Sequence, residues 1–347
     1  MDESSVMRAR DVARKAGVSA SAVSRAFTPG ASIAPETRRR IIEAAEEIGY
    51  KPDLIARSLT SGRSNIVGIG VGNLENPFFA DSLNQLSAAF ATAGLRVLLF
   101  PATARGASEA QVHEVLQYRL DALVLLSTNL SSSLANQCRN AQIPVIMYNR
   151  TTADPGRVSS VTGNNRGGAR AIAAHLVAAG HQRPCFMAGH DDASTSAARE
   201  EGFTGFFRDR GLPAPMRETG HFTREGAAAA TRRLLTLPQP PDAIFCANDH
   251  MAIAAIDVAR AEFGLDVGRD ISIAGFDDVP MASWPSFSLT TYAQPTAEMV
   301  HETLAIARAL GEGVTEPVHK VIEGRLVLRG STRRLPGAAT AGAAPVR

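Results

Sequence analysis

Residues 19–25 hold the side chains whose types and spacing most directly suggest a chemistry. Three serines and two alanines lead this segment, and an arginine ends it. Small side chains let the start of a helix lie deep in the major groove of DNA, where backbone amides meet phosphates and a nearby arginine can bind guanine through two hydrogen bonds. An ordinary helical hairpin with an exposed arginine is the alternative interpretation. The residues that we predict to contact DNA are Ser19, Ala20, Ser21, Ala22, Ser24 and Arg25.

A glycine run after the first apolar segment could suggest a nucleotide site. Gly68, Gly70 and Gly72 recur at two-residue spacing, which is not the GxGxxG pattern. Pro77 also follows where a dinucleotide-binding loop would enter its helix. We therefore interpret the run as a tight turn at a sheet edge. The chain has no GxSxG, HExxH or phosphate-loop lysine motif, so the sequence predicts no enzyme.

Histidines and paired aspartates are the other candidates for a reactive or metal-binding site. His181 and His190 are interpreted as solvated loop residues. The aspartate pairs at 191–192 and 277–278 resemble hydrated turns or helix caps, and no third metal ligand is spaced nearby. We therefore predict no metal and no cofactor.

Composition and charge bound the class of protein. The chain has 347 residues, enough for two or three compact units, and its 45% hydrophobic and 20% charged residues are ordinary for a soluble globular protein. Residues 1–63 hold eleven Lys/Arg against eight Asp/Glu, a formal charge of +3, whereas the remainder carries −1. The excess positive charge thus lies with the predicted DNA-binding segment, as attraction to phosphate requires.

The cysteines and the N-terminal residues indicate the cellular compartment of the protein. Cys138, Cys185 and Cys246 show no paired spacing, so we interpret them as buried thiols in a reducing compartment. No apolar run has the character of a signal peptide or the length of a membrane span. We expect a cytoplasmic protein with no membrane partner.

The segment at 19–25 must be positioned by short helices. Val12, Ala13 and Ala16 recur at helical spacing. Gly17 suits a tight turn because it adopts positive φ without steric cost, and Ser19 can cap the helix that follows. The pattern therefore predicts helix, tight turn, helix.

A third helix is predicted between Pro35 and Gly49. Proline suits the first helical position and glycine ends a helix, and between them lies an apolar stripe at Ile41, Ile42, Ala45 and Ile48. Three short helices around one core form a helix-turn-helix headpiece. Residues 53–61 can form a two-turn hinge helix, which is too short to stay ordered unless something holds it.

From residue 65 onward, apolar runs alternate with amphipathic stretches. This alternation predicts an α/β fold with parallel sheets covered on both faces, and the length fits two sheets. Amphipathic helices are expected between the runs, including one near 107–118, and a glycine-containing connection is expected near Val161. Strands are predicted at 65–71, 95–100, 122–126, 144–148, 185–189, 243–247 and 271–276, with shorter ones at 289–292, 319–323 and 326–328.

Several separated motifs resemble those of the LacI/GalR family of transcriptional repressors. The resemblance covers almost the whole chain and is carried by DVARKAGVSASAVSRAF (11–27), ETRRRIIEAAEEIGYKPDLIARSLTSGRSNIVGI (36–69), NPFF (76–79), HLVAAGHQRPCFMAG (175–189), AIFCANDHMAIAAI (243–256), ISIAGFDD (271–278) and LVLRGST (326–332). It implies an α/β protein with an N-terminal three-helix helix-turn-helix headpiece and a hinge helix. These precede a periplasmic-binding-protein-like core of two doubly wound parallel-sheet subdomains, joined by three crossovers.

The resemblance also implies a domain organisation. The headpiece is assigned to residues 1–52, the hinge helix and linker to 53–64, and the effector-binding and dimerisation core to 65–332. The N-subdomain of the core takes residues from about 65–162 and 293–322, the C-subdomain takes about 163–292 and 323–332, and 333–347 is a disordered tail.

An effector is expected in the cleft between the subdomains, because ligands of open α/β sheets bind beyond the carboxyl ends of the strands. Two phenylalanines would stack on a small ring, and an arginine and an aspartate would hold its oxygens. At any single position, a polar strand end is the alternative interpretation. The resemblance implies the effector-binding residues Phe78, Asn149, Arg199, Phe222, Asn248, Asp277 and Gln294.

Some positions depart from the family pattern. Ala34 stands where many members have a serine helix cap, and Asn149 and Asn164 stand where many have aspartate. The two asparagines lower the negative charge near the cleft, which makes a sugar acid easier to bind. Residues 333–347 contain no apolar heptad, so we expect dimers and no tetramer.

The sequence thus predicts a homodimeric, sequence-specific DNA-binding regulator, specifically a repressor of a carbon-utilisation operon controlled by a small sugar or sugar acid. Its partners would be that effector and double-stranded DNA with a pseudo-palindromic operator. In the dimer, two hinge helices could present Ala56 and Leu59 to the minor groove. The alternatives are a solute-binding transport component, which would need a secretion signal, and a Rossmann-type enzyme, which would need a phosphate loop.

Overall fold

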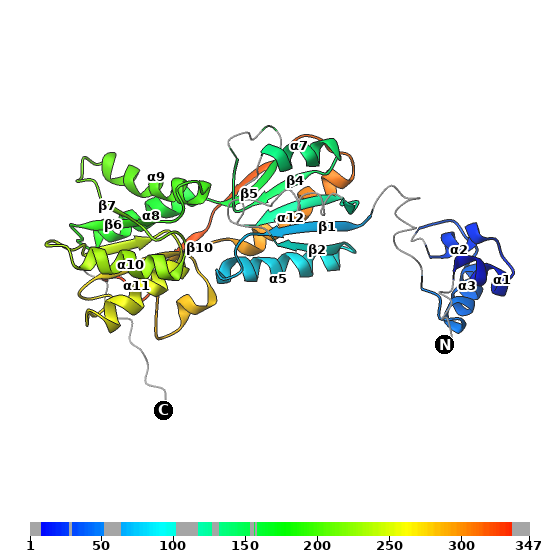
Figure 1. Cartoon of the computed structure of the whole chain (residues 1–347), viewed down its shortest axis with the longest axis horizontal. Coiled ribbons are helices and arrows are strands. Elements are labelled where there is room, and N and C mark those ends of the chain that lie inside the picture. The colour runs from blue at the N-terminus through cyan, green and yellow to red at the C-terminus, as the bar shows by residue number, and fades with distance from the viewer. Residues whose placement is uncertain are drawn as a thin grey trace, which may run out of the picture. The chain divides into compact units, whose positions relative to one another are not determined.

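The chain divides into two units, Met1–Asn65 and Ile66–Arg347 (Figure 1). The structure, a computed structural model, describes residues 8–27, 30–51, 64–101, 117–126, 132–152, 156 and 158–334. The predicted hinge helix with Ala56 and Leu59 lies outside the described residues, as do most of the helix expected near 107–118 and residues 335–347 of the predicted tail. The two units are considered separately below.

The first unit contains the three predicted helices, α1 (Ala9–Ala16), α2 (Ala20–Ala26) and α3 (Pro35–Glu47). Gly17 ends α1 at φ 63°, and the Ser19 hydroxyl accepts a hydrogen bond from the Ala22 amide at 3.2 Å, so the turn and the cap form as predicted. Gly49 follows α3 at φ 68°. The stripe on α3 is shifted, because Ala44 is buried and Ile42 is only half-buried.

The first sheet of the second unit has the strand order β11-β5-β4-β3-β1-β2, and every pair in it is parallel. Helices α5 (Pro77–Thr92), α7 (Ser132–Asn140) and α12 (Thr296–Gly311) belong to this subdomain (Figure 1). Its strands are β1 (Ile66–Val71), β2 (Arg96–Pro101), β3 (Ala122–Leu126), β4 (Val145–Tyr148), β5 (Ser159–Gly163) and β11 (His319–Ile322).

The second sheet has the order β12-β10-β9-β8-β6-β7. It is parallel except at its edge, where β12 runs antiparallel to β10, a mixture that the sequence pattern did not predict. Its helices are α8 (Asn165–Ala178), α9 (Ser194–Arg208), α10 (Arg224–Leu235) and α11 (Asp249–Ala261). Its strands are β6 (Pro184–Ala188), β7 (Met216–Thr219), β8 (Ala243–Cys246), β9 (Ser272–Asp277), β10 (Thr290–Ala293) and β12 (Arg325–Val327).

Two predictions about the first sheet are wrong. The expected connection near Val161 is strand β5, whose sequence SSVTG has one strongly apolar residue; Ser159 and Ser160 instead bond to the Val318 amide and to His319. The glycine run is not an edge turn, because Gly68 and Gly70 lie inside β1, between β2 and β3. A Cβ at Gly68 would lie 2.6 Å from Cδ1 of Leu120, so packing requires glycine there.

The chain passes between the two sheets three times, and polar contacts join the three passages. The Asn164 side chain donates a hydrogen bond to Glu323 at 2.6 Å and accepts one from the Gly167 amide, so it also caps α8. The Tyr292 hydroxyl accepts a hydrogen bond from the Gly324 amide at 2.9 Å and lies 3.5 Å from the Glu323 carboxylate. Residues from all three passages thus meet at one carboxylate.

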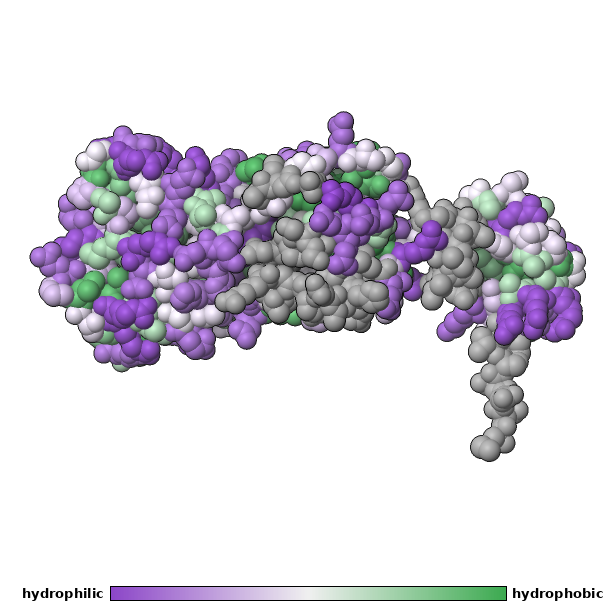
Figure 2. All heavy atoms as spheres, turned by 45° about the horizontal axis from the view of Figure 1, so that its top comes forward, coloured by the Kyte–Doolittle hydropathy of each residue, from purple (hydrophilic) through white to green (hydrophobic). Residues whose placement is uncertain are grey.

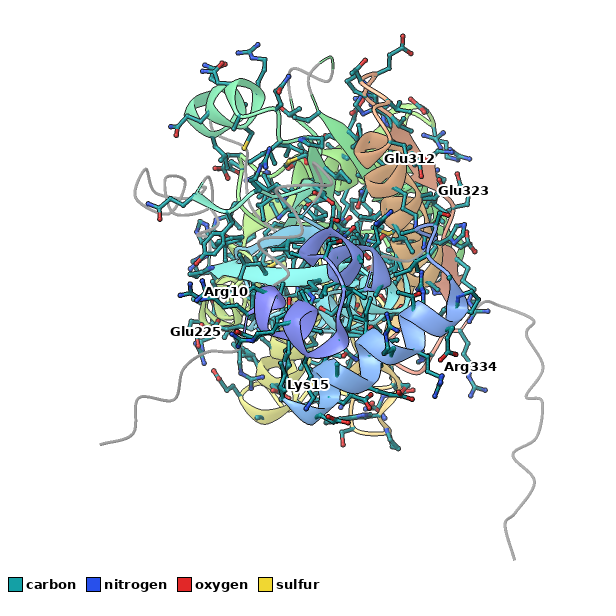
Figure 3. The ribbon with its side chains drawn as sticks, turned by 90° about the vertical axis from the view of Figure 1, so that its right-hand side faces the viewer. Arg10, Lys15, Glu225, Glu312, Glu323 and Arg334 are labelled. Carbon is teal, nitrogen blue, oxygen red and sulfur yellow. The ribbon has the colours of Figure 1, made fainter. Side chains whose placement is uncertain are left out.

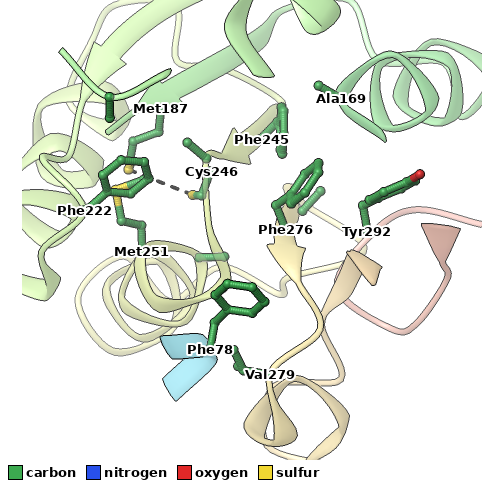
Figure 4. Packing of buried hydrophobic residues seen from close by; sticks show 14 of the residues in the cluster. Phe78, Ala169, Met187, Phe222, Phe245, Cys246, Met251, Phe276, Val279 and Tyr292 are labelled. Carbon is green, nitrogen blue, oxygen red and sulfur yellow. Dashed lines mark hydrogen bonds between the residues drawn. The ribbon is translucent and has the colours of Figure 1, made fainter. Parts of the chain in front are cut away.

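The core of the second unit is built from the apolar strands and the helices that cover them. Aromatic rings on neighbouring elements pack against one another, including Phe186, Phe203, Phe245 and Phe276, whose centroids lie 5.2–6.5 Å apart where they meet. Figure 4 shows Phe245 and Phe276 in this core. All three cysteines are buried and form no disulfide, as the sequence predicts.

The surface of this unit is mostly hydrophilic in the view of Figure 2. Large apolar side chains are exposed at separate positions, among them Leu99 on β2, Trp284, and Val321 on β11. Across the described ranges, no helix is both long and apolar enough to cross a membrane.

His181 is buried, so its prediction as a solvated residue is wrong. Gly180 ends the turn after α8 with φ 82°, and the chain folds back so that the ring packs inside. Nε2 lies 2.7 Å from the Ser272 hydroxyl, and Nδ1 lies 3.5 Å from the Asp242 carboxylate, beyond a good hydrogen bond. Burial lowers the pKa of His181, and the Asp242 carboxylate opposes that shift only partly.

This lowered pKa makes the stability of the core sensitive to acid. Below the ordinary histidine pKa of about 6.5, the unfolded chain binds the proton that the buried ring resists, so the free energy of unfolding falls as the pH drops through that window. His181→Gln should flatten this part of the profile, measured by urea unfolding between pH 5 and pH 8, whereas exposed His301→Gln should not. Burial raises the pKa of Asp249 to about 7, which acts in the opposite direction, but this contribution cancels in the difference from wild type. Parallel profiles for wild type and His181→Gln would refute the prediction.

Candidate DNA-binding and effector-binding sites

The exposed face of α2 carries most of the residues predicted to contact DNA. Ser19, Ala20, Ser21, Ser24 and Arg25 are exposed. The Ser19 hydroxyl accepts the capping hydrogen bond from the Ala22 amide, and it lies 2.9 Å from the Ser21 hydroxyl.

Two further observations concern the surface around α2. Ala22 is only 9% exposed and packs in the headpiece core, so the structure does not bring it to the surface. Arg10 and Lys15 on α1 are also at the headpiece surface, and Lys15 is paired with Glu47 (Figure 3). Arg25 forms no ion pair within the part of the headpiece that the structure describes.

A cleft in the second unit collects residues that follow the carboxyl ends of strands from both sheets. Its partly open cavity measures about 30 Å³, room for only a few water molecules. A sugar therefore needs more room than this conformation of the cleft provides. The residues that line the cleft are Asn73, Asn76, Phe79, Asn149, Arg150, His190, Thr195, Arg199, Phe222, Asn248 and Asp277.

The structure brings together all but one of the residues predicted to bind the effector. Asn149, Arg199, Phe222, Asn248 and Asp277 line the cleft. Gln294 is 7% exposed and joins them through the hydrogen bonds described below.

Phe78 is the exception. It is 4% exposed and packs against Tyr148 at a centroid distance of 6.5 Å, while its neighbour Phe79 lines the cleft. Successive residues of a helix point about 100° apart, so a prediction that is one residue out selects the wrong face. Phe222 rests on the core side against Gly189, beside Met187, Cys246 and Met251 (Figure 4).

Arg199 is fully buried and held on several sides. Nε donates a hydrogen bond to Oδ1 of Asn165 at 2.8 Å, Nη1 donates to the Ala247 carbonyl, and Nη2 lies 3.3 Å from Oδ1 of Asp277. The guanidinium lies 3.8 Å from the centroid of the Phe276 ring, an arrangement that favours a cation. Burial lowers the pKa of Arg199 and the Asp277 carboxylate opposes this shift.

Asp277 fixes the orientation of the neighbouring amides. Its Oδ1 accepts a hydrogen bond from Nε2 of Gln294 at 3.3 Å, and the same nitrogen lies 3.2 Å from Oδ1 of Asn149. Because a carboxylate only accepts hydrogen bonds, Gln294 must present its nitrogen and Asn149 its oxygen. Oε1 of Gln294 is left buried with no hydrogen-bond partner and packs close to Gly163.

Sequence reasoning missed Arg150, which lies directly after Asn149 and is 6% exposed. Nη1 donates hydrogen bonds to the Thr195 hydroxyl and, at 3.3 Å, to the Asn149 carbonyl. The guanidinium also lies 5.9 Å from the centroid of Phe222. Burial and then repulsion from Arg199 lower the pKa of Arg150 to about 10. A basic residue immediately after a buried strand was the signal in the sequence that could have identified it.

Contacts also join the two subdomains across the cleft. Arg150 and Thr151 follow β4 of the first sheet, whereas Ser194 and Thr195 begin α9 of the second subdomain. The Thr151 amide donates a hydrogen bond to the Ser194 hydroxyl at 3.0 Å, beside the bond between Arg150 and Thr195. These bonds hold the described conformation closed.

Over the described parts of the chain, no three His, Cys, Asp or Glu side chains are placed to hold a metal ion.

Comparison with known families assigns both units. Residues 9–53 match the model of bacterial regulatory proteins of the lacI family, and residues 173–332 match that of the periplasmic binding protein-like domain. Among solved structures, a Lac repressor dimer bound to operator and the anti-inducer ONPF is similar with a TM-score of 0.84 and 25% identity, covering 94% of this chain and 99% of that one. A CelR–cellobiose complex is similar with a TM-score of 0.70 and 28% identity over 94% and 99% of the two chains.

Curated relatives extend over nearly the whole chain. The transcriptional repressor CytR of Escherichia coli is 30% identical over 94% of this chain and 96% of its own, and the regulator CelR of Thermobifida fusca is 33% identical over 92% and 96%. The probable repressor ExuR of Bacillus subtilis is 29% identical over 94% and 98%. These relatives are named as regulators of transcription and not as enzymes. The chain belongs to the LacI family of DNA-binding transcriptional regulators.

Proposed function

We propose that this regulator is a repressor of a carbon-utilisation operon, and that a small sugar-like or sugar-acid effector in the cleft controls its binding to DNA. The observation that carries the proposal is the pairing of an exposed, serine-lined α2 with a cleft of buried polar groups in a separate unit. The relatives support it, since one solved structure holds operator DNA and another holds cellobiose. Such a repressor works in the cytoplasm, where its operator is.

The proposal includes a homodimer on a pseudo-palindromic operator. A twofold axis presents two copies of α2 to two half-sites, and the Lac repressor relative is a dimer on its operator. In this arrangement the hinge residues Ala56 and Leu59 meet the minor groove at the operator centre. The domain ranges given above follow from the same proposal, as do the contacts of Ser19, Ala20, Ser21, Ser24 and Arg25 with DNA.

The two alternatives are less well supported. A solute-binding transport component would account for the core, but it has no use for residues 9–53, which match a regulatory DNA-binding family. A Rossmann-type enzyme would need a phosphate loop, and Gly68 and Gly70 are used for packing inside β1.

Arg25→Ala tests the assignment of the recognition helix. The variant should lose about 1–3 kcal/mol of operator binding and relax the preference at one guanine in each half-site, because one pair of base contacts is removed. Site selection from random duplexes followed by fluorescence anisotropy measures both effects. The control is Arg39→Ala, whose arginine is already paired with Glu36 and Glu43 on α3. If Arg25→Ala selects the same sequence with the same affinity as wild type, α2 is not the recognition helix.

A further inference from the structure

The charges buried in the cleft do not balance. Arg150 and Arg199 line it together, and Asp277 is the acidic side chain among the lining residues. Asp277 is already engaged by Arg199 and Gln294 through its Oδ1. The lining therefore carries one more buried cation than buried carboxylate.

Arg150 is the cation that has no hydrogen-bonded carboxylate, although the charges of Asp277 and Asp192 also act on it. It donates hydrogen bonds to two neutral oxygens, those of Thr195 and the Asn149 backbone, and no carboxylate in the described part of the core forms an ion pair with it. Its other close neighbour is the face of Phe222. A buried guanidinium without a carboxylate is costly, and a charge-assisted bond is about twice as strong as a neutral one. Arg150 would therefore bind an anion in the cleft in preference to its present partner, the Thr195 hydroxyl.

Helix caps add further donors around the same cavity. The side-chain oxygens of Asn76 and Asn248 accept hydrogen bonds from the Phe78 and Met251 amides, at 3.1 and 2.9 Å. Because the oxygen of each amide is used in the cap, its NH₂ group is the part left to meet a ligand. Helix α9, which supplies Thr195, begins at Ser194, and its N-cap residue Ala193 provides no side-chain cap, so the helix dipole adds positive potential. These groups add hydrogen-bond donors and positive potential to the cleft.

We propose that the effector is a monoanion, a small sugar acid whose carboxylate binds Arg150 between the two subdomains. This inference rests on the proposed function, because it names the class of effector for the same cleft. One negative charge balances the excess positive charge of the lining, whereas a phosphate dianion would leave an excess negative charge there. The Asp277 carboxylate, which lines the cavity, then accepts hydrogen bonds from the hydroxyls of the sugar. The carboxylate replaces the Thr195 hydroxyl as the partner of Arg150, so binding exchanges one contact across the cleft for another.

Isothermal titration calorimetry of the full-length protein tests the proposal with matched pairs. The probes are uronates and aldonates of the common hexoses and pentoses, each beside its neutral parent sugar, with glucose 6-phosphate as the phosphate arm. We expect at least one acid to bind about 10- to 100-fold more tightly than its neutral parent, the range set by one hydrogen bond to a charged group. Arg150→Gln should bring the ratio of acid affinity to neutral-parent affinity close to one, whereas exposed Arg224→Gln should leave that ratio as in wild type.

A second variant guards against a folding defect. Asn149→Asp preserves side-chain volume and adds a carboxylate next to Arg150 in the chain, so the ratio of acid affinity to neutral-parent affinity should fall at least 10-fold relative to wild type. Neutral sugars that bind as tightly as their acids would overturn the inference and leave the proposed function intact, as would a preference for the phosphate. A panel in which no acid binds also overturns it. Only operator binding that no ligand alters would count against the proposed function itself.

Discussion

Replacing Arg199 by methionine is expected to lower the free energy of unfolding of the core by about 3–5 kcal/mol and to abolish effector binding. The loss is large because the buried Asp277 would lose its counter-charge, so its carboxyl group must either stay charged in a buried site or take up a proton. Asn165 and the Ala247 carbonyl would also lose their donor. Methionine keeps most of the apolar volume of the side chain. The cost therefore reports the broken network more than a cavity.

Urea unfolding followed by circular dichroism measures this cost. Arg217→Met is the matched control, since Arg217 also pairs with two carboxylates, those of Asp191 and Glu200, but its side chain is 43% exposed. Exposed pairs contribute at most about 1 kcal/mol. The double variant Arg199→Met/Asp277→Asn should recover part of the loss, because the unpaired charge is removed. Equal losses for Arg199→Met and Arg217→Met would contradict the account of a buried, charge-balanced network.

The second large effect is expected from Ile41→Ala in the headpiece. Ile41 is fully buried on α3, among side chains of α1 and α2. Truncating a buried isoleucine to alanine costs about 2–5 kcal/mol, and a domain of this size rarely has more than about 3–5 kcal/mol of stability. The headpiece should therefore be largely unfolded at 25 °C, and specific DNA binding should be lost.

Effector binding should survive this change, because the core is a separate unit. The full-length variant is assayed twice, by anisotropy with labelled operator and by calorimetry with the effector. Ile42→Ala, at the adjacent and only half-buried position, is the control and should retain most of the operator affinity. Operator binding that is equally strong in both variants would show that this three-helix core does not present the DNA-binding surface.

Local structure was predicted best at positions where a single physical requirement explains the residue type. Gly17 at positive φ and Ser19 as a cap are such cases, and both are found in the turn between α1 and α2. Strands were predicted where apolar runs are long, because a continuous apolar run is the main sequence feature of a buried parallel strand. Strand β5 was missed because its two serines form hydrogen bonds with the Val318 amide and with His319, which a hydropathy pattern cannot show.

Errors in the candidate site have a similar origin. Strand ends located Asn149 and Asp277, but they could not decide between Phe78 and Phe79, because that choice depends on the rotation of α5. Arg150 was missed, and His181 was wrongly predicted to be solvated, because their burial depends on residues far away in the chain, Thr195 and Ser272 respectively. Polar side chains that are buried by distant partners leave no periodic signal in the sequence.

In the proposed function, a change in the cleft would link the effector to DNA. The cavity of about 30 Å³ is small for a sugar, so a bound sugar would change the contacts across the cleft. The bonds of Arg150 to Thr195 and of Thr151 to Ser194 join the subdomains and are the contacts that such a ligand would replace or preserve. A ligand that binds one cleft geometry better than the other shifts the population between them.

The central claim is that occupancy of the cleft controls operator binding by α2, and one titration tests it most directly. The dissociation constant for a labelled operator is measured by fluorescence anisotropy at fixed salt, with and without a saturating ligand identified by calorimetry. The account predicts a change of about 5- to 150-fold in wild type, typical of allosteric coupling, and none in Arg199→Met. An operator affinity that stays the same while calorimetry shows the cleft occupied would contradict it.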